Sequence, residues 1–368
     1  MMAGLIHLIL AAGFLAVSIF GMPGSEHHGV HTRCPAFREG TLDLYQWQLY
    51  PDSAVFDFDN CVLYISALFN GSMVKYDPYK NKPLEIISFP GISDVFDEHA
   101  SGLHLGRKSG VVSLVIDAQP AFLTNGANAS GDYWLVKYDT RARRELWRAN
   151  LTSVTQARWA GFQDVTVDAR GNSYVVGTYP RSILRVDKTG RHITPWLPPQ
   201  QPINTTLHGY TGICSTGDTL LVVDANGVPE ELSEGNSQLY RFDMRQPTAG
   251  KPVLVPRTPR GVLLPNSDAI HLPERYGGTV MFVAHSYIGI TVLRSRNGWR
   301  SAEQLGTIPS DFPAFFQRII SSTVQIGSER QFMIGQKFPG SIVPGTKGGN
   351  QSDFPFFDIT AQVEALLA

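Results

Sequence analysis

The sequence predicts an all-β protein, a six-bladed β-propeller of four-stranded antiparallel blades, from three observations. Short runs of alternating apolar and polar residues are separated by Asp-x-x-Gly and Asp-x-x-Gly-Asn turns, a pattern typical of antiparallel hairpins. This pattern recurs six times at intervals of roughly 45 to 65 residues, the spacing of propeller blades with loop insertions. No helical pattern interrupts the series before residues 360–367, so the sequence lacks the crossover helices that a parallel α/β sheet requires.

The clearest copy of the repeat runs from Gly161 to Gly190, and a fourth alternating run at 192–197 completes its meander. The innermost strands of the other five copies are expected to start at Ser53, Ser101, Thr211, Asp268 and Arg318. Residues 41–49 are expected to supply an edge strand that closes the ring with the last blade. A pair of β-sandwiches is the alternative, but the regular register favours a propeller. The predicted single domain spans residues 41–368, after an amino-terminal segment at 22–40.

The composition excludes several classes of protein. The chain has 368 residues, 17% of them charged, and a net charge of −1, whereas nucleic-acid binding normally needs a basic face. The 43% hydrophobic content excludes wholesale disorder and also a polytopic membrane protein. With 35 Gly and 24 Pro, the chain is expected to be globular and rich in turns.

The first 21 residues are predicted to be a secretory signal peptide. Residues 5–20 are almost entirely apolar, too few for a comfortable membrane span, and small residues and a turn follow them. An uncleaved anchor is the alternative, because the segment lacks an amino-terminal Lys or Arg. After cleavage we expect no stable membrane insertion and a secreted or vesicular location. Five N-x-S/T sequons favour the same route, at Asn70, Asn128, Asn150, Asn204 and Asn350.

The chain has three cysteines, an odd number, so an oxidising compartment predicts one disulfide and one buried thiol. A Cys34–Cys61 bridge would staple the amino-terminal segment to the first repeat, although the sequence leaves the connectivity open. Cys214 lies in an apolar run and is expected in the core.

In a propeller, equivalent positions of successive blades converge around one axis, so the repeat register predicts a site at the channel mouth. The inner-strand starts place Ser53, Ser101, Asp164, Thr211, Asp268 and Arg318 in one ring. The residues just before this ring include Asp52, Gln163 and Tyr210. The second strands end on Ser66, Asp117, Thr178, Asp224, His285 and Gln336. The combination of Asp268, His285, Gln163 and Tyr210 favours a functional site, because paired titratable groups in a concave mouth are unusual as filler.

Two further groups of residues are candidates at the same rim. Glu98 and His99 precede the second blade and could form an acid–base pair, or they could belong to an exposed loop. Aromatic residues near the strand ends suit a large apolar ligand, although such residues are also common in cores: Trp47, Phe162, Tyr179, Tyr287, Phe316 and Phe338.

The segments Gln163–Val175 and Ser267–Gly278 resemble those of calcium-dependent lactonase and strictosidine-synthase-like six-bladed propellers. Lactonases of that group hold a divalent cation with Glu, Asn and Asp at the inner-strand starts. The matching positions here carry Asp52-Ser53, Gln163, Thr211 and Asp268, of which only Asp268 keeps the pattern. The resemblance therefore implies the fold, whereas the departures from the ligand pattern argue against a tight calcium site and against lactone hydrolysis.

The whole chain is more similar to secreted-looking propeller proteins of fungal secondary-metabolite clusters, which include a trichothecene-cluster protein and hetero-Diels–Alderases of tropolonic sesquiterpene biosynthesis. The shared features are the apolar leader, the early cysteines, residues 273–278 and Phe338–Gly340. That resemblance implies a cofactor-free pericyclase that holds a tropolone quinone methide against a sesquiterpene such as humulene. His285, Tyr210 or Arg318 would donate to the tropolone oxygen, and Glu98, His99 or Asp268 would assist loss of water. A metal-dependent hydrolase and a non-catalytic carrier of small apolar molecules are the alternatives.

Overall fold

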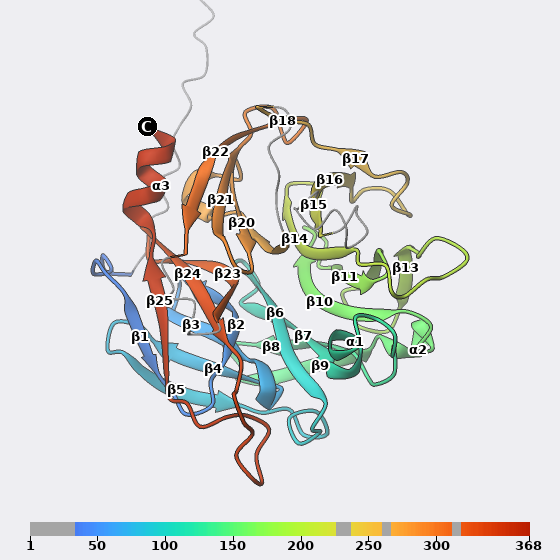
Figure 1. Cartoon of the computed structure of the whole chain (residues 1–368), viewed down its shortest axis with the longest axis horizontal. Coiled ribbons are helices and arrows are strands. Elements are labelled where there is room, and N and C mark those ends of the chain that lie inside the picture. The colour runs from blue at the N-terminus through green and yellow to red at the C-terminus, as the bar shows by residue number, and fades with distance from the viewer. Residues whose placement is uncertain (1–33, 226–236, 260–265, 311–317) are drawn as a thin grey trace, which may run out of the picture.

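The computed structural model describes residues 34–225, 237–259, 266–310 and 318–368. The predicted signal peptide at 1–21 and most of the segment at 22–40 lie outside these residues, as does Phe316. Six antiparallel sheets surround a central axis (Figure 1), which confirms the predicted six-bladed propeller. The inner strands, one per blade, are β2 (Pro51–Asp57), β6 (Glu98–Gly106), β10 (Ala160–Val167), β14 (Tyr210–Thr216), β19 (Ser267–His271) and β23 (Arg318–Ile326).

Each inner strand is followed outward by its neighbours in chain order. In the first three blades these are β3 (Val62–Ala67), β4 (Ser72–Asp77) and β5 (Lys82–Ile87), then β7 (Val111–Ala118), β8 (Trp134–Asp139) and β9 (Arg144–Asn150), then β11 (Ser173–Tyr179), β12 (Ser182–Val186) and β13 (Ile193–Leu197). In blades 4 and 5 they are β15 (Thr219–Asp224), β16 (Gln238–Asp243) and β17 (Val253–Leu254), then β20 (Val280–His285), β21 (Gly289–Arg294) and β22 (Ala302–Pro309), with β18 (Arg257–Thr258) parallel to β22.

The ring closes as the sequence predicts. Blade 6 continues from β23 through β24 (Arg330–Lys337) and β25 (Asp353–Asp358) to β1 (Leu42–Tyr45), which comes from the start of the chain and pairs antiparallel with β25. The predicted terminal helix is α3 (Thr360–Leu367), which lies outside the ring beside β22. Two short helices, α1 (Gln119–Leu123) and α2 (Thr152–Thr155), and the 3-10 turns η1 (Leu68–Asn70) and η3 (Glu274–Tyr276) were not predicted. Among the described residues, no helix is long and apolar enough to cross a membrane.

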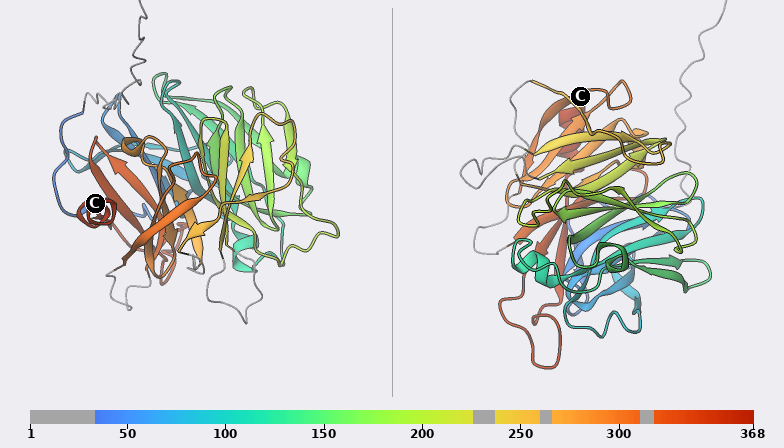
Figure 2. Two further views of the ribbon diagram at one scale, coloured as in Figure 1. Left: turned by 90° about the horizontal axis from the view of Figure 1, so that it is seen from above. Right: turned by 90° about the vertical axis from the view of Figure 1, so that its right-hand side faces the viewer.

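Six clusters of buried apolar side chains hold the blades together, one at each seam. Trp196 fills the seam between blades 3 and 4, and Trp299 fills the next. Alternation along the strands supplies these faces, since every second side chain of a blade points at its neighbour. The two views of Figure 2 show the blades standing side by side around the axis.

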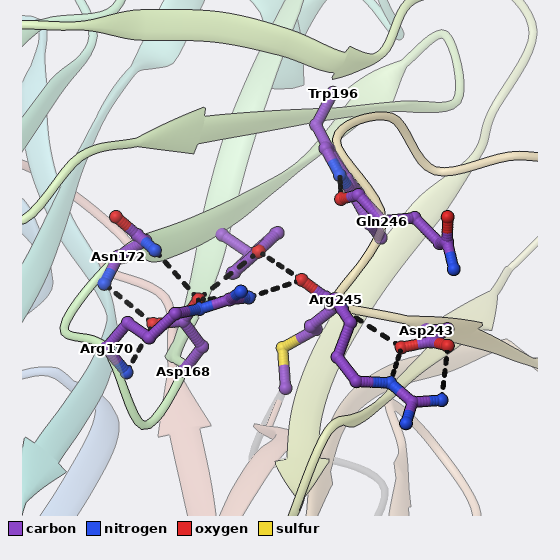
Figure 3. Close-up of polar contacts among 9 residues, drawn as sticks. Asp168, Arg170, Asn172, Trp196, Asp243, Arg245 and Gln246 are labelled. Carbon is purple, nitrogen blue, oxygen red and sulfur yellow. Dashed lines mark hydrogen bonds and ion pairs between the residues drawn. The ribbon is translucent and has the colours of Figure 1, made fainter.

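The turns that punctuate the sequence also join blades at the lower face, where each inner strand ends. In the Asp-x-x-Gly-Asn turn after β10, the Asp168 carboxylate accepts the backbone N–H groups of Arg170 and Asn172, both at 2.9 Å. Arg170 then donates to the Met244 carbonyl of blade 4 at 2.5 Å (Figure 3). Trp196 Nε1 bonds the Gln246 carbonyl at 3.1 Å across the same seam. The turn residues therefore close a hairpin and link two blades at once.

The structure contains the expected Cys34–Cys61 disulfide, which joins the amino-terminal segment to the β2–β3 turn, and leaves Cys214 as a free thiol. We expect the Cys34→Ser/Cys61→Ser variant to lose about 3 kcal/mol of unfolding free energy, because the bridge constrains the unfolded chain. Urea titration with and without a thiol reductant measures the loss. The reductant should lower the midpoint of the native chain and leave that of the double variant unchanged; an equal response of both would contradict the assignment.

Candidate functional site

A cavity of about 450 Å³ occupies the axis of the propeller. All six inner strands line it, so every blade contributes to one site. Each inner strand shifts register against its neighbour within its first residues, at 51–54, 100–103, 162–164, 210–212, 267–270 and 320–322. Such bulges re-aim side chains that a regular ladder would hold on one face of the sheet. The site is therefore formed by β-bulges at equivalent positions, near the start of the inner strand in every blade.

The ring predicted from the repeat register lines the cavity in five of the six blades: Ser53, Ser101, Asp164, Thr211 and Asp268, with Asp52 and Gln163 beside them. In blade 6 the bulge at 320–322 brings Ser321 and Ser322 to the cavity, two residues that the repeat register did not single out. The side chains of Arg318 and Gln336 lie outside the described part of the structure.

Hydrogen bonds between blades hold this ring in place. Gln163 Nε2 donates to the Thr211 carbonyl at 3.0 Å, and Thr211 Oγ1 donates to the Ser267 carbonyl at 2.9 Å. Ser321 Oγ donates to the Asp52 carbonyl at 2.6 Å, across the seam between blades 6 and 1. The side chains of Gln163 and Thr211 thus serve as connectors between inner strands.

Most of the second-strand ends point elsewhere. Asp117 lines the cavity, but Ser66, Thr178, Asp224 and His285 do not. Ser66 Oγ lies 2.9 Å from the backbone nitrogen of Ser53, and Thr178 donates to the Tyr210 carbonyl at 2.9 Å. Asp224 pairs with Arg181 at 2.6 Å, and fully buried His285 contacts Thr291 Oγ1 at 2.8 Å. The polar residues at these strand ends therefore contact neighbouring protein groups outside the cavity. The prediction that His285 faces the cavity mouth is wrong.

Several predicted ligand contacts are core or surface residues instead. Phe162 and Tyr179 are buried in the seam between blades 2 and 3, and Tyr210 is buried between blades 3 and 4. Trp47 and Tyr287 are exposed outside the cavity, so of the described aromatic candidates only Phe338 lines it. The apolar lining that sequence reasoning missed includes Phe56, Phe58, Leu68, Phe69, Phe122 and Leu123.

The pair Glu98 and His99 separates in the structure. His99 lines the cavity, with its ring 5.2 Å from Phe69 and Nδ1 4.0 Å from Asp117 Oδ1. Burial lowers the pKa of His99 to about 4, so the ring is neutral at neutral pH. Glu98 is buried outside the cavity, where Oε1 accepts Trp134 Nε1 at 3.2 Å. Both residues belong to β6, which corrects the alternative of an exposed loop.

Four aspartic acids line the cavity in addition to Glu274: Asp52, Asp117, Asp164 and Asp268. Their pKa values are all raised, primarily because they lie far from bulk solvent, and Asp52 adds repulsion to the other three. The pKa of Asp164 rises to about 8 even though its oxygens accept two backbone N–H groups, from Val165 at 2.8 Å and Ile213 at 3.0 Å. Within the described part of the chain, the buried Asp117 Oδ1 has no hydrogen-bond partner. The cavity therefore holds carboxylic acids that keep their protons near neutral pH.

This protonation has a measurable effect on stability. In the unfolded chain Asp164 ionises near 3.9, whereas in the folded chain it keeps its proton up to about pH 8. The folded state thus binds more protons between these values, and the unfolding free energy falls as pH rises through that window. Calorimetric melting of the native chain and of Asp164→Asn should show a steeper fall for the native chain between pH 6.5 and 8. If stability falls equally with pH in both proteins, the raised pKa of Asp164 is contradicted. Lys137, whose pKa is lowered to about 7, gives stability the opposite pH dependence, and this contribution cancels because both proteins contain Lys137.

The lower end of the cavity is bridged across the axis. Arg107, just after β6 of blade 2, forms an ion pair with Glu274 of blade 5, and its guanidinium lies 5.0 Å from the centre of the Phe58 ring. Phe58 and Glu274 line the cavity, so this group forms its floor. Blades 2 and 5 stand on opposite sides of a six-bladed ring, so the ion pair crosses the axis at the lower end of the cavity.

Lys347 connects two loops at the upper mouth of the cavity. Its Nζ donates to the backbone carbonyls of Ser93 at 3.3 Å and Glu98 at 3.1 Å, and also to that of Val95. The loop between β24 and β25 is thereby fastened to the loop that precedes β6.

Replacing Lys347 by Met should cost about 1–3 kcal/mol, because the three carbonyls lose a charged donor. Cleavage by a nonspecific protease should then increase within residues 88–97, with Lys108→Met on the lower face as the matched control. An unchanged cleavage pattern in Lys347→Met would contradict the fastening role.

The described residues do not fit a resident divalent metal. They contain no group of three or more His, Cys, Asp and Glu side chains placed to hold an ion. Gln163 and Thr211, which the sequence comparison above aligned with metal-ligand positions of lactonases, are engaged in the hydrogen bonds between blades described above.

Comparison with known proteins agrees with this architecture. The chain is 33% identical over 352 residues to trichothecene biosynthesis protein 14 of Trichoderma arundinaceum, an alignment that covers 91% of this chain and 92% of the relative. The chain belongs to this family. Core trichothecene cluster protein 14 of Fusarium sporotrichioides is 29% identical over 360 residues, covering 93% of this chain and 91% of that protein. No family model matches the sequence.

Among solved structures, the major allergen Mala s 1 of Malassezia sympodialis superposes with a TM-score of 0.68 at 18% identity, over 88% of this chain and 96% of the allergen. The calcium-binding protein regucalcin of Agrobacterium tumefaciens superposes with a TM-score of 0.51 at 14% identity, over 88% and 94%. These likenesses concern the fold. By their names, one relative is a trichothecene biosynthesis protein and the other a core trichothecene cluster protein.

Proposed function

We propose that this family member is a cofactor-free pericyclase, an intermolecular hetero-Diels–Alderase that joins a tropolone quinone methide to a sesquiterpene such as humulene in fungal meroterpenoid biosynthesis. The observation that carries the proposal is a single cavity with an apolar upper part and a ring of aspartic acids at the level of the bulges. Its volume of about 450 Å³ falls within the range of small-molecule sites, and its upper part is lined by Leu68, Phe69, Phe122 and Phe338. Protonated aspartic acids lie at the level of the bulges.

The apolar upper part suits a hydrocarbon partner. Phe69 and Phe338 stand edge to face with their ring centres 6.5 Å apart, and Phe69 also contacts His99. Aromatic and aliphatic walls bind a sesquiterpene through burial of apolar surface. Holding two reactants together removes much of the entropic cost of a bimolecular cycloaddition, which needs no cofactor.

The aspartic acids suit the oxygenated partner. A protonated carboxyl such as Asp268 donates its proton to the hydroxyl of a hydroxymethyl tropolone; the C–O bond breaks and water leaves. The resulting carboxylate takes the proton of the ring hydroxyl, which yields the neutral quinone methide and restores the acid. The same acid then donates a hydrogen bond to the carbonyl oxygen of the heterodiene. The cycloaddition forms one C–C and one C–O bond and consumes no proton.

The proposal is tested by assay of the dehydrated adduct with purified protein before and after exhaustive chelation, with metal analysis of both samples. We expect full activity in the chelated protein. Stoichiometric calcium that is lost together with activity would contradict the proposal and favour the hydrolase alternative. The proposed reactants are small and apolar. The disulfide is compatible with the secretory pathway that we propose for the protein.

A further inference from the structure

The two faces of the propeller differ in chemistry. On the upper face, which carries the cavity mouth, the loops expose large apolar side chains: Trp47, Val95, Phe96, Leu123, Leu207, Tyr287, Ile288, Phe338 and Ile342. Within the described chain, none of the exposed large apolar side chains lies in the turns of the lower face. The described upper loops hold three acidic and three basic residues: Asp94, Asp97, Asp132, Arg158, Arg181 and Lys347.

All five sequons lie on this same upper face. Asn70 ends η1 and Asn128 follows α1, both between the second and third strands of their blades. Asn150 is the last residue of β9, Asn204 precedes β14, and Asn350 precedes β25. A face so poor in charge and rich in exposed apolar residues needs a polar cover to stay monomeric in water.

Hydrogen bonding divides the five asparagines into two groups. Asn128, Asn204 and Asn350 are exposed, and their side chains accept hydrogen bonds through Oδ1. The donors are the backbone N–H groups of Ser130 at 3.0 Å and Thr206 at 3.1 Å, and Trp47 Nε1 at 3.3 Å. Nδ2, the atom that an N-glycan modifies, stays outside these bonds.

The other two asparagines use Nδ2 differently. Asn70 is half-buried and its Nδ2 donates to the Gln48 carbonyl at 3.0 Å. Asn150 is also half-buried, and its Nδ2 donates to Asp132 Oδ1 at 3.2 Å. A sugar on either nitrogen would have to displace a protein contact.

We propose that Asn128, Asn204 and Asn350 carry N-linked glycans in the folded protein, that Asn70 and Asn150 do not, and that these glycans cover neighbouring apolar side chains. In each case a bond forms between Nδ2 and the anomeric carbon of a polyprenyl-pyrophosphate-linked oligosaccharide, the bond from that carbon to the pyrophosphate breaks, and Nδ2 loses one proton. This modification is independent of the reaction in the cavity.

Each proposed glycan has an apolar neighbour to cover. Leu123 lies in the same loop as Asn128, and Leu207 in the same loop as Asn204. Trp47 contacts Asn350 directly, so its exposed ring can stack on a sugar. Leu123 and Phe338 also line the cavity, so the Asn128 glycan would border its entrance.

The full chain, secreted from a fungal host, is treated with peptide-N-glycosidase in ¹⁸O water and mapped by mass spectrometry. The proposal expects ¹⁸O-labelled Asp at positions 128, 204 and 350 and unmodified Asn at 70 and 150. Comparable labelling at Asn70 or Asn150, or no labelling at any of the five, would overturn it. Unglycosylated chain that binds neutral phosphatidylcholine vesicles would instead assign the upper face to a lipid surface.

The covering role is tested on folded protein. Trimming the glycans with an endoglycosidase under native conditions should increase binding of an apolar fluorescent dye several-fold and promote self-association. The Ser130→Ala/Thr206→Ala/Ser352→Ala variant, which removes the three sequons and keeps every Asn, should behave in the same way, with Thr189→Ala on the lower face as control. Trimmed protein that stays monomeric and does not bind the dye would overturn the covering role.

Discussion

Asp268→Asn is expected to lower the turnover of the proposed reaction by about 10²–10³-fold, the size of effect seen when a general acid or a key hydrogen-bond donor is removed. Asp268 lines the cavity, and burial together with the charges of Asp52 and Asp164 raises its pKa well above the usual range. Asn keeps the shape and one donor but cannot deliver a proton. Loss of water should therefore suffer more than cycloaddition of a preformed quinone methide.

The control for this variant is Asp43→Asn, an exposed carboxylate on β1, the outermost strand of blade 6. It changes the same chemical group far from the cavity and should keep native turnover. Rates of both variants are measured with the hydroxymethyl precursor and with a quinone methide generated in solution. Native turnover in Asp268→Asn with both substrates would remove Asp268 from the proposed mechanism.

Gly212→Ala is expected to destabilise the protein by about 1–3 kcal/mol or more, because the added Cβ overpacks the contact between two inner strands. A Cβ at Gly212 would lie 2.7 Å from the Ile270 backbone nitrogen and 2.8 Å from the Asp268 carbonyl oxygen. Both atoms belong to the inner strand of blade 5, so relief requires the blades to separate beside Asp268. Melting temperature and turnover should therefore fall together.

Gly340→Ala is the matched control for this second variant, because a Cβ there meets no atom within 4 Å. It should leave both the melting temperature and the turnover near the native values. A Gly212→Ala protein as stable as the Gly340→Ala protein would show that the inner strands of blades 4 and 5 have more room than the structure places between them.

Much of the fold could be predicted from the sequence because turn chemistry and strand alternation are local. The Asp-x-x-Gly-Asn turn after β10 fixes where a hairpin reverses, and the same pattern of turns and alternating residues, repeated along the chain, predicts the positions of the other strands. Even the pairing of Leu42–Tyr45 with the last blade follows, since a ring leaves one edge to close.

The site was harder to predict because its geometry depends on bulges. A bulge changes which residue faces the axis by one or two positions, and no repeated residue type marks it. In blade 6, Ser321 and Ser322 therefore line the cavity although the repeat register did not single them out. Phe162 and Tyr179 fill a seam, whereas Phe69 and Phe122 line the cavity, because the direction of an aromatic side chain at a strand end is set by packing of the neighbouring blade.

The enantiomeric composition of the adduct most directly tests the claim that this cavity orients two reactants. Quinone methide and humulene are combined with the native chain, with the chain inhibited by an excess of unreactive tropolone analogue, and in buffer alone. The account predicts one dominant enantiomer with the native chain and a racemic product in the other two. A racemic product at an unchanged regioisomer ratio in all three samples would contradict pericyclase activity on this pair of reactants.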